Sequence, residues 1–292
     1  MAGIGQTPRS FAPFKRFVLD HADDVFDVIA HRRTQTNEPG RCATLLPAFG
    51  LARQPLALIE VGAAGGLCLQ PDRYGYDYRD GVIRGHTSSP VVIRCVLPGR
   101  RPTLPPAVEV AWRAGVDQVP VDVTDDDQVR WLQACVWPDQ PDRLARLRAA
   151  VNLARTDPPR IIEGDLVDTL PSLASSAPDD ACLCVFHSAV LGYLDPADRL
   201  RFIDVLDDIA EHRPLVWISN DAPRVVPVLD HLVPADTDET AFMLTLSTFS
   251  HPGRRDNLLA MADPHGAWLD WRLSAAPHHT PGSTECDLRH TV

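Results

Sequence analysis

The sequence predicts an α/β fold whose mostly parallel sheet carries helices on both faces. Three observations predict it. A short apolar run at 56–61 leads into small residues at 62–66, as a buried strand does when it enters a ligand-binding turn. Apolar runs then alternate with amphipathic helical segments between positions 108 and 219. Two final apolar runs flank 263–266, whose Asp-Pro-His-Gly sequence predicts a C-terminal antiparallel hairpin.

The composition combines ample apolar material with an acidic balance. The 292 residues are 45% hydrophobic, and 39 acids outweigh 28 bases to give a net charge of −11. Because no dense Lys/Arg cluster occurs, we expect a small-molecule substrate, and neither nucleic acid nor a membrane as partner. The composition leaves the oligomeric state open.

The cysteines and the N-terminal segment favour a cytoplasmic location. None of the seven cysteines forms a C-x-x-C pair, and no group of His, Cys and carboxylate residues has ligand spacing. We therefore expect no metal site. Residues 1–16 lack the apolar region of a signal peptide, and the longest uncharged stretch, 181–194, is too short to cross a bilayer.

We expect residues 1–54 to form an arm followed by a helical cap ahead of the sheet. Apolar positions at a helical period predict one helix over 14–31. Asn37 can then cap a second helix, which has Pro39 in its first turn and runs through Leu46.

We expect residues 55–276 to form the sheet domain and residues 277–292 to form a flexible tail. After the first strand, the segment 71–106 is rich in Tyr, Arg, Gly and Pro. It predicts a β-hairpin insertion in place of the usual long helix. We expect Tyr76 and Tyr78 to lie on a solvated hairpin, paired with aromatic residues across the strands.

The remaining elements are expected to alternate along the chain. Helices are expected to begin at a Thr124 cap, at Pro141 and at Asp195-Pro196. Strands are expected at 108–116, 160–163, 182–186, 215–219 and 241–250.

The residues that follow each strand matter most for function, because parallel sheets of this kind bind ligands beyond the carboxyl ends of their strands. These residues are Glu60 with the turn 62–66, Asp117, Asp165, His187, Ser188, Asn220 and Asp221.

The turn after the first strand fits one of two cofactor patterns better. The dinucleotide fingerprint needs glycines spaced by one and then two residues, and its third position falls on Leu67. The acid-x-Gly-x-Gly-x-Gly turn of S-adenosylmethionine (SAM) dependent methyltransferases is matched by Glu60, Gly62, Ala64 and Gly66, with one Gly→Ala departure. The turn therefore resembles a SAM-binding turn.

Longer segments carry the same resemblance. Segment 186–195 resembles the fourth-strand segment of class I SAM-dependent methyltransferases, which have a Rossmann-like fold. Several phrases also resemble an uncharacterised bacterial family of unknown function with this presumed fold. They are 35–38, 41–47, the Glu60 turn, 72–74, 136–138 and 186–188. The resemblance covers 34–272 and implies a Rossmann-like methyltransferase fold.

The resemblance also implies a SAM cofactor and roles for the strand-end residues. Glu60 would lie near the ammonium group, Asp117 would accept hydrogen bonds from the ribose, and Asp165 would bind the adenine amino group. Asp117 could equally be a solvated turn residue, and Asp165 a helix cap. The rest of the cofactor would contact Gly62, Ala64, Gly65 and Gly66 along its methionine, Leu166 beside its adenine, and His187 and Ser188 at its methyl group.

His187 is the candidate general base, because histidine titrates near neutral pH. Tyr193 and Asp221 are alternative catalytic candidates. A histidine at this position can also be a core residue with a backbone partner. The candidate substrate contacts are Asn37, Arg41, Arg73 and Tyr74. Asn37 and Arg41, with Glu38 between them, would equally serve as a helix cap and a surface ion pair.

These features predict SAM-dependent methyl transfer to a small or medium-sized molecule. One alternative is a SAM-sensing or partner-binding module without turnover, which Ala64 and the rebuilt region after the first strand suggest. A further alternative is an NAD(P)-dependent reductase.

Overall fold

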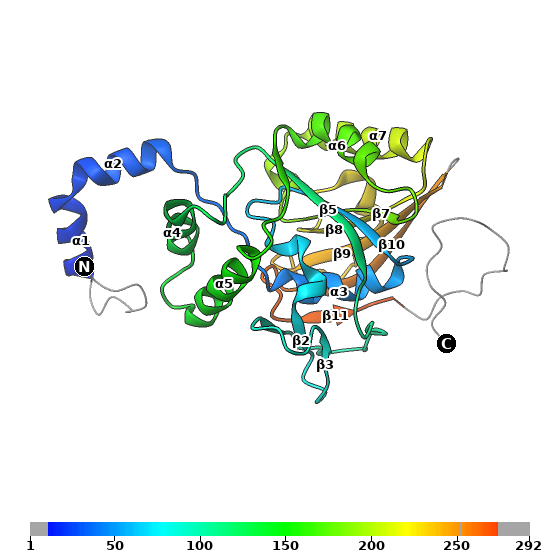
Figure 1. Cartoon of the computed structure of the whole chain (residues 1–292), viewed down its shortest axis with the longest axis horizontal. Coiled ribbons are helices and arrows are strands. Elements are labelled where there is room, and N and C mark those ends of the chain that lie inside the picture. Colours follow the sequence, from blue (N-terminus) through cyan, green and yellow to red (C-terminus); the bar gives the residue numbers. More distant parts are fainter. Residues whose placement is uncertain (1–10, 251–252, 274–292) are drawn as a thin grey trace.

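The computed structural model describes residues 11–250 and 253–273, and its centre is an eight-stranded mixed sheet (Figure 1). In sheet order the strands are β6 (Ile161–Glu163), β5 (Val110–Asp117), β1 (Leu56–Val61), β7 (Cys182–Ser188), β8 (Leu215–Asp221), β9 (Phe242–Ser250), β10 (Gly253–Ala262) and β11 (Leu269–Trp271). Neighbours from β6 to β8 are parallel, and those from β8 to β11 are antiparallel. The predictions of a mostly parallel sheet and a C-terminal antiparallel hairpin are confirmed. The predicted tail at 277–292 lies outside the described residues.

The parallel strands follow an order that creates a switch point. Numbered along the chain, β1, β5, β6, β7 and β8 are the first to fifth parallel strands, so their spatial order is 3-2-1-4-5. This is the order of doubly wound sheets, in which the strand order reverses beside the first strand. The carboxyl ends of β1 and β7 meet at the point of reversal, which is where such sheets bind ligands.

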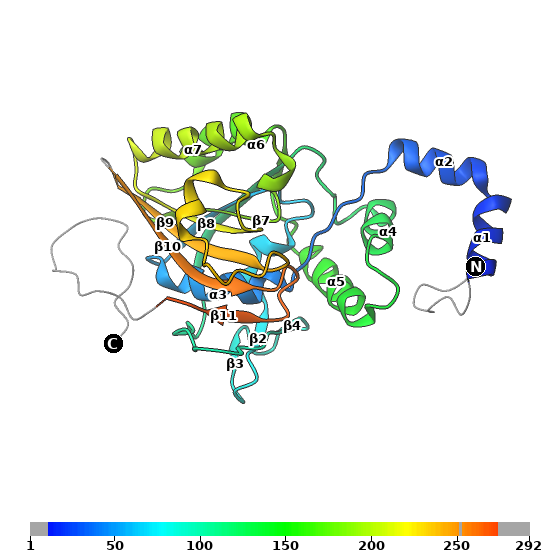
Figure 2. The same ribbon diagram turned by 180° about the vertical axis from the view of Figure 1, so that it is seen from behind.

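Helices cover both faces of the parallel strands, as predicted (Figures 1 and 2). Helices α6 (Leu166–Ser176) and α7 (Pro196–Ala210) lie on one face, and α3 (Arg41–Leu51) lies on the other. Alternate residues of β1 serve the two layers: Ala57 and Ile59 pack with α6 and α7, and Leu56 and Leu58 pack with α3. A parallel strand buried on both faces needs the continuous apolar run that the sequence shows.

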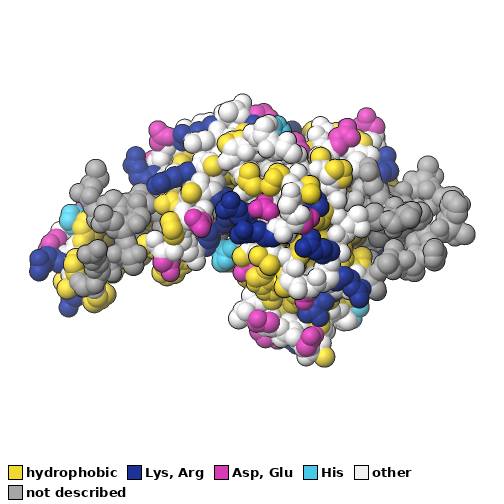
Figure 3. All heavy atoms as spheres, turned by 90° about the horizontal axis from the view of Figure 1, so that it is seen from below, with side chains coloured by type: hydrophobic (Ala, Val, Ile, Leu, Met, Phe, Trp, Pro, Cys, Tyr) yellow, Lys and Arg dark blue, Asp and Glu magenta, His cyan; other side chains and the backbone are white. Residues whose placement is uncertain are grey.

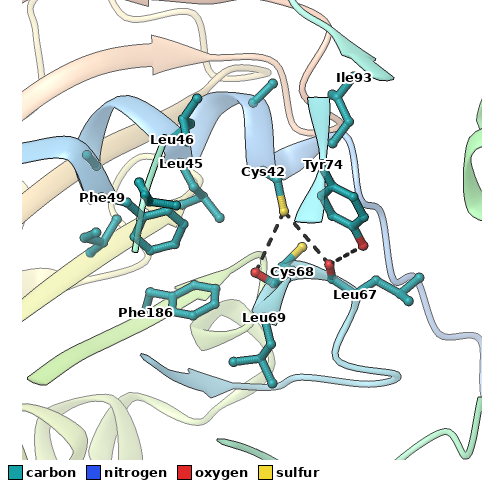
Figure 4. Packing of buried hydrophobic residues seen from close by; sticks show 14 of the residues in the cluster. Cys42, Leu45, Leu46, Phe49, Leu67, Cys68, Leu69, Tyr74, Ile93 and Phe186 are labelled. Carbon is teal, nitrogen blue, oxygen red and sulfur yellow. Dashed lines mark hydrogen bonds between the residues drawn. The ribbon is translucent and has the colours of Figure 1, made fainter. Parts of the chain in front are cut away.

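The core beneath α3 is drawn in Figure 4. Phe49 of α3 meets Phe186 of β7 edge to face, with ring centroids 5.2 Å apart at an angle of 87°. The Tyr74 hydroxyl donates to the Leu67 carbonyl at 2.7 Å. Complete burial of side chains of this size contributes about 1.5–3 kcal/mol each, so α3 is an integral layer of the fold.

The predicted hairpin insertion is present, but it is not solvated. Strands β2 (Gly75–Asp77) and β3 (Ile83–Gly85) form the antiparallel hairpin, and β4 (Val92–Arg94) pairs parallel to β2. Tyr76 and Tyr78 are buried, and their hydroxyls donate to the carbonyls of Pro71 and Ala43, both at 2.6 Å. The expectation of exposed tyrosines was wrong, because the insertion packs against α3 and extends its core.

The N-terminal helices also depart from the prediction. Two helices, α1 (Phe11–Asp20) and α2 (Ala22–His31), replace the single expected helix, and neither contains a buried residue. Residues 11–31, which we call the arm, project away from the sheet (Figures 1 and 2). The predicted cap over the sheet is therefore formed by α3 alone.

Helices α4 (Asp126–Ala134) and α5 (Pro141–Ala154) connect β5 to β6. Asp125 caps α4 by accepting two backbone N–H groups, whereas Thr124 was the predicted cap. The Thr124 hydroxyl instead donates to Asp122 at 2.7 Å within the preceding turn. Among the helices that the structure describes, none combines the length and the apolarity needed to cross a bilayer.

The root of the arm is fixed on α4. The Arg32 guanidinium lies 5.7 Å from the centre of the Trp131 ring and also pairs with Asp127. The indole N–H of Trp131 donates to the Arg33 carbonyl at 2.8 Å. These contacts hold the chain where it leaves α2 and enters the extended segment before α3.

Candidate functional site

The glycine-rich turn 62–66 follows β1 at the switch point, and its backbone is strained. Gly62 and Gly66 have φ values of +72° and +66°, and Ala64 has a φ of +49°. A left-handed conformation costs a non-glycine residue about 1–2 kcal/mol. Ala189, directly after β7, is strained in the same way, with a φ of +60°. Strain of this kind tends to gather at functional sites.

The protein itself satisfies the backbone N–H groups of this turn. Ala64 N donates to Asp117 Oδ2 at 2.8 Å. Gly65 N and Leu67 N both donate to Asn37 Oδ1, at 3.1 Å each. Asn37 is therefore neither the cap of α3, which begins after Gly40, nor a free substrate contact. Its side chain lies against the turn.

Asp117 retains capacity for a further hydrogen-bond donor. Its second oxygen, Oδ1, accepts from Val119 N at 2.9 Å and lies 3.5 Å from the amide nitrogen of Gln35. An ionised carboxylate offers about four acceptor positions, and Asp117 is half-buried. It can thus hold its own turn and still accept from a hydroxyl.

The side chains of Val190 and Pro159 occupy the space beside Gly62 and Gly66, which have no side chains of their own. A Cβ on Gly62 would lie 2.4 Å from Val190, and a Cβ on Gly66 would lie 2.5 Å from Pro159. Val190 follows the strained Ala189, so the turn after β7 packs directly on the turn after β1. The site is closed in this conformation.

Replacing Gly62 by alanine is expected to destabilise the protein by about 2–5 kcal/mol. The left-handed backbone accounts for about 1–2 kcal/mol and overpacking against Val190 for about 1–3 kcal/mol. Gly81→Ala is the matched control, because Gly81 has a φ of +81° but no atom of the described residues within 4 Å of the added Cβ. Urea unfolding measures both variants. Equal losses of unfolding free energy would contradict the close packing at Gly62.

A buried polar group lies on the α3 side of the sheet. Glu60 is 4% exposed, and its Oε2 has no hydrogen-bond partner within the described ranges. Burial raises the pKa of Glu60 well above its ordinary value, Cys68 and Asp117 raise it further, and Arg41 opposes them. Arg41 itself is held by the carbonyls of Ser188 and Pro264, at 2.9 Å each.

Asn220 completes this group beside β7. Its Nδ2 donates to Ser188 Oγ at 2.8 Å, while its Oδ1 is buried without a partner in the part of the chain that is described. The Ser188 hydroxyl is thus held inward, toward α3. Its position depends on Asn220 and not on the turn 62–66.

A second polar group lies on the opposite side of the sheet, beneath α7. His187 Nδ1 lies 3.2 Å from Asp221 Oδ2, although neither ring nitrogen makes a well-directed hydrogen bond to the described residues. The same Asp221 oxygen accepts from Val190 N and Leu191 N, at 3.2 and 3.1 Å. The pair therefore braces the turn whose Val190 packs against Gly62.

The sequence led us to expect that His187 and Ser188 both face the methyl group of the cofactor. The structure shows that they cannot. They are consecutive residues of β7, so their side chains point to opposite faces of the sheet. His187 packs beside Phe202 and Trp217, with ring centroids 6.0 and 5.8 Å away. Ser188 points toward Asn220.

The other predicted site residues have structural contacts. Asp165 caps α6 through two backbone N–H groups, and Leu166 is buried in the core beneath that helix. The Arg73 guanidinium bonds to the end of α5 and the residues after it, and Tyr74 is buried beneath α3. Tyr193 is 91% exposed, whereas His187 and Asp221 are buried.

Glu38 is a site residue whose role the sequence did not reveal. It is 3% exposed and accepts from Arg143 at 2.7 Å and from Arg146 at 2.9 Å. The expected surface ion pair with Arg41 is therefore replaced by a buried network with other arginines. Burial alone would raise the pKa of Glu38, but Arg146 and Arg143, with the Gly40 N–H, lower it. This network fixes segment 34–40 over the turn. No local pattern signals it, because the two arginines lie 105 and 108 residues further along the chain.

Two small cavities flank the closed site. One is lined by Ser219, Asp221 and Thr245 among others, and one lies between segment 35–38 and the α4–α5 pair. Each has a volume of about 10 Å³, which is room for about one water molecule. A larger ligand would require segment 34–38 or the turn 189–191 to move.

A family model described as "Uncharacterized protein conserved in bacteria (DUF2332)" matches residues 2–271 of this chain. The matched range contains the arm, the glycine-rich turn and all of the predicted site residues from Asn37 to Asp221. A search of curated proteins found no match.

Proposed function

Since the chain belongs to this family of uncharacterised bacterial proteins, we propose its function from the site alone: it binds SAM at the switch point and transfers the methyl group to a small or medium-sized molecule. One observation carries the proposal. The buried Glu60 carboxyl group has an oxygen without a partner in the described residues, beside a strained glycine-rich turn at the reversal of a doubly wound sheet.

The binding roles follow from the needs of these side chains. Burial disfavours the charged form of the unpaired Glu60 carboxyl group, and a ligand ammonium group placed beside it would stabilise that form. Asp117 has acceptor capacity left for ribose hydroxyls, and it already touches the turn through Ala64 N. The resemblance of the Glu60–Gly66 pattern to SAM-binding turns supports the choice of this ligand.

His187 is the proposed base. When bound, SAM would supply the methyl group from its sulfonium, with the S–CH₃ bond breaking as the acceptor bonds to that carbon and the sulfur leaving as a neutral thioether. His187 would take the proton that the acceptor loses, and Asp221 would orient the imidazole through Nδ1. General-base catalysis contributes about 10²–10⁴-fold to a rate.

Binding must be accompanied by opening. Asn37 and Val190 occupy the turn in the closed form. We expect the 34–38 segment to withdraw from the turn when SAM enters, which frees Gly65 N and Leu67 N for the ligand. Release of part of the backbone strain at Ala64 and Ala189 would lower the free-energy cost of this rearrangement.

SAM binding is expected to release a proton from Glu60. Burial raises the pKa of Glu60 well above that of an ordinary glutamate and so favours the protonated form in the closed site. A bound ammonium group would lower that pKa, so the complex holds fewer protons. Titration calorimetry in buffers of different ionisation enthalpy should give a buffer-dependent heat, which Glu60→Gln removes and Glu163→Gln, at an exposed glutamate, retains. Absence of any heat with SAM would reject the proposal.

The closed turn also favours a second candidate, a SAM-sensing or partner-binding module without turnover. The N–H groups of Ala64, Gly65, Gly66 and Leu67 are all bonded within the protein. Incubation with SAM and a cell extract separates the two functions. Formation of S-adenosylhomocysteine, detected by mass spectrometry and absent with His187→Gln, supports transfer. Binding of SAM without this product supports the module.

A further inference from the structure

Arg41 is a buried cation that forms no ion pair with a carboxylate of the described residues. Its side chain is 9% exposed, and its Nε and Nη1 donate to the carbonyls of Pro264 and Ser188, at 2.9 Å each. Its third nitrogen, Nη2, makes no hydrogen bond to the residues that the structure describes. A buried charge is normally paired with an opposite one. Arg41 therefore keeps both a charge and donors for a ligand.

Two guanidinium groups of α5 face the segment that leads into Arg41. Arg143 and Arg146 bind the single carboxylate of Glu38 through their Nε atoms. The Nη2 of Arg143 and both terminal nitrogens of Arg146 make no hydrogen bond within the described ranges. Because each guanidinium carries five N–H donors, most of the donors of Arg146 stay available.

These cations come together around Gly40, where α3, α5 and the turn 263–266 meet. A Cβ on Gly40 would lie 2.4 Å from the His265 carbonyl oxygen and 3.2 Å from Arg146 Nη2. Arg41 reaches the same turn, because its Nε donates to the Pro264 carbonyl. The missing side chain of Gly40 thus lets the two arginines approach one turn.

The surroundings of His265 show the excess of positive charge. Burial lowers the pKa of His265, and Arg143 and Arg41 lower it further, while Asp263 and Glu38 oppose them. Glu38 is already bound by arginines, and Asp263 Oδ1 accepts two backbone N–H groups of its own turn. Figure 3, which views the molecule from the side of the insertion, shows Lys and Arg side chains gathered near the middle of this face. Such a gathering, on a chain whose net charge is −11, favours an anionic ligand.

We propose that Arg41, Arg143 and Arg146 form a subsite for an oxyanion, a carboxylate or phosphate group that the methyl acceptor carries. The inference rests on the proposed function and gives its acceptor a chemical class, a small or medium-sized anion. A guanidinium can donate two parallel hydrogen bonds to such a group. The bond from Arg41 to the Ser188 carbonyl places the subsite at the carboxyl end of β7, beside the proposed point of transfer.

Titration of the full-length protein with inorganic phosphate tests the subsite without SAM. Calorimetry at constant ionic strength should detect binding to the wild type. Arg146→Gln and Arg143→Gln should each weaken it about tenfold or more, since charge-assisted hydrogen bonds are lost. Each variant leaves the other arginine on Glu38. Arg201→Gln, which removes a surface arginine of α7, is the matched control and should bind phosphate as the wild type does.

Two results of this titration would overturn the subsite. One is a wild type that does not bind phosphate. The other is binding that both glutamine variants retain at full strength. Thermal unfolding without phosphate checks that the variants are folded, and either variant suffices for the comparison if the other unfolds.

A second titration, in saturating SAM, assigns the oxyanion to the acceptor. Phosphate should bind with its affinity unchanged, because cofactor and acceptor occupy different places. Displacement of phosphate by SAM would overturn this assignment and give the subsite to the carboxylate of SAM. A protein that binds phosphate but not SAM would instead reject the proposed function and leave the oxyanion subsite in place.

Fractionation of a cell extract tests the charge of the acceptor directly. The acceptor should be retained on an anion-exchange resin and eluted by salt, so that only the eluted fractions support formation of S-adenosylhomocysteine. Acceptor activity that passes through the resin unretained would show that the acceptor is not an anion and would overturn the inference.

Discussion

Glu38→Ala is expected to lower the free energy of unfolding by about 3–5 kcal/mol, the usual cost of breaking a buried ion pair. The change leaves two arginine side chains, which are 14% and 21% exposed, without their carboxylate. It also removes the acceptor of Gly40 N. Because the two guanidinium groups keep some contact with water, the loss should lie near the lower end of this range.

Glu239→Ala is the matched control, because Glu239 pairs with Arg224 on the surface, where both side chains are more than half exposed. A surface pair contributes about 0–1 kcal/mol. Urea unfolding at neutral pH compares the two variants. Similar losses in both would show that the buried network does not stabilise the fold.

The pH dependence of this difference has a definite sign. The pKa of Glu38 is lowered in the folded protein, so its stabilising effect is complete above the unfolded glutamate pKa of about 4.3. The effect disappears as the pH falls through the lowered folded pKa. The wild type should therefore lose stability on acidification more steeply than Glu38→Ala, and the two should converge in strong acid.

Asn37→Ala is expected to destabilise the protein by about 2–4 kcal/mol. It leaves Gly65 N and Leu67 N without an acceptor in a buried turn, and each such group costs about 1–3 kcal/mol. Asn37→Asp, which keeps an oxygen at the same position, should retain most of the stability. Chemical unfolding of both variants tests this. Equal stability of the alanine and aspartate variants would mean that water replaces the lost oxygen.

The sheet could be predicted because its strands are local features of the sequence. A parallel strand buried on both faces must be an apolar run, and its ligand-binding turn needs residues such as Gly62 that accept a positive φ. The proximity of Asp117 to that turn also followed, since β1 and β5 are neighbours whose carboxyl ends lie at one edge. These conclusions required no knowledge of distant side chains.

The contacts that close the site could not be predicted, because they join residues far apart along the chain. The partners of Asn37 and Glu38 are fixed only once α5 and the turn after β1 are both in place. The burial of Tyr76 and Tyr78 likewise depends on α3 lying beneath the insertion. Their sequence, rich in polar aromatic residues, is compatible with an exposed hairpin as well.

The single oxygen that joins segment 34–38 to the turn has a kinetic consequence. The amide hydrogens of Gly65 and Leu67 share Asn37 Oδ1, so any motion that withdraws this side chain exposes both at once. Their hydrogen–deuterium exchange should therefore proceed at a common opening free energy, below that of the surrounding sheet. The exchange rates of these two amides therefore report on the opening of the site. NMR can follow them before any ligand or acceptor is known.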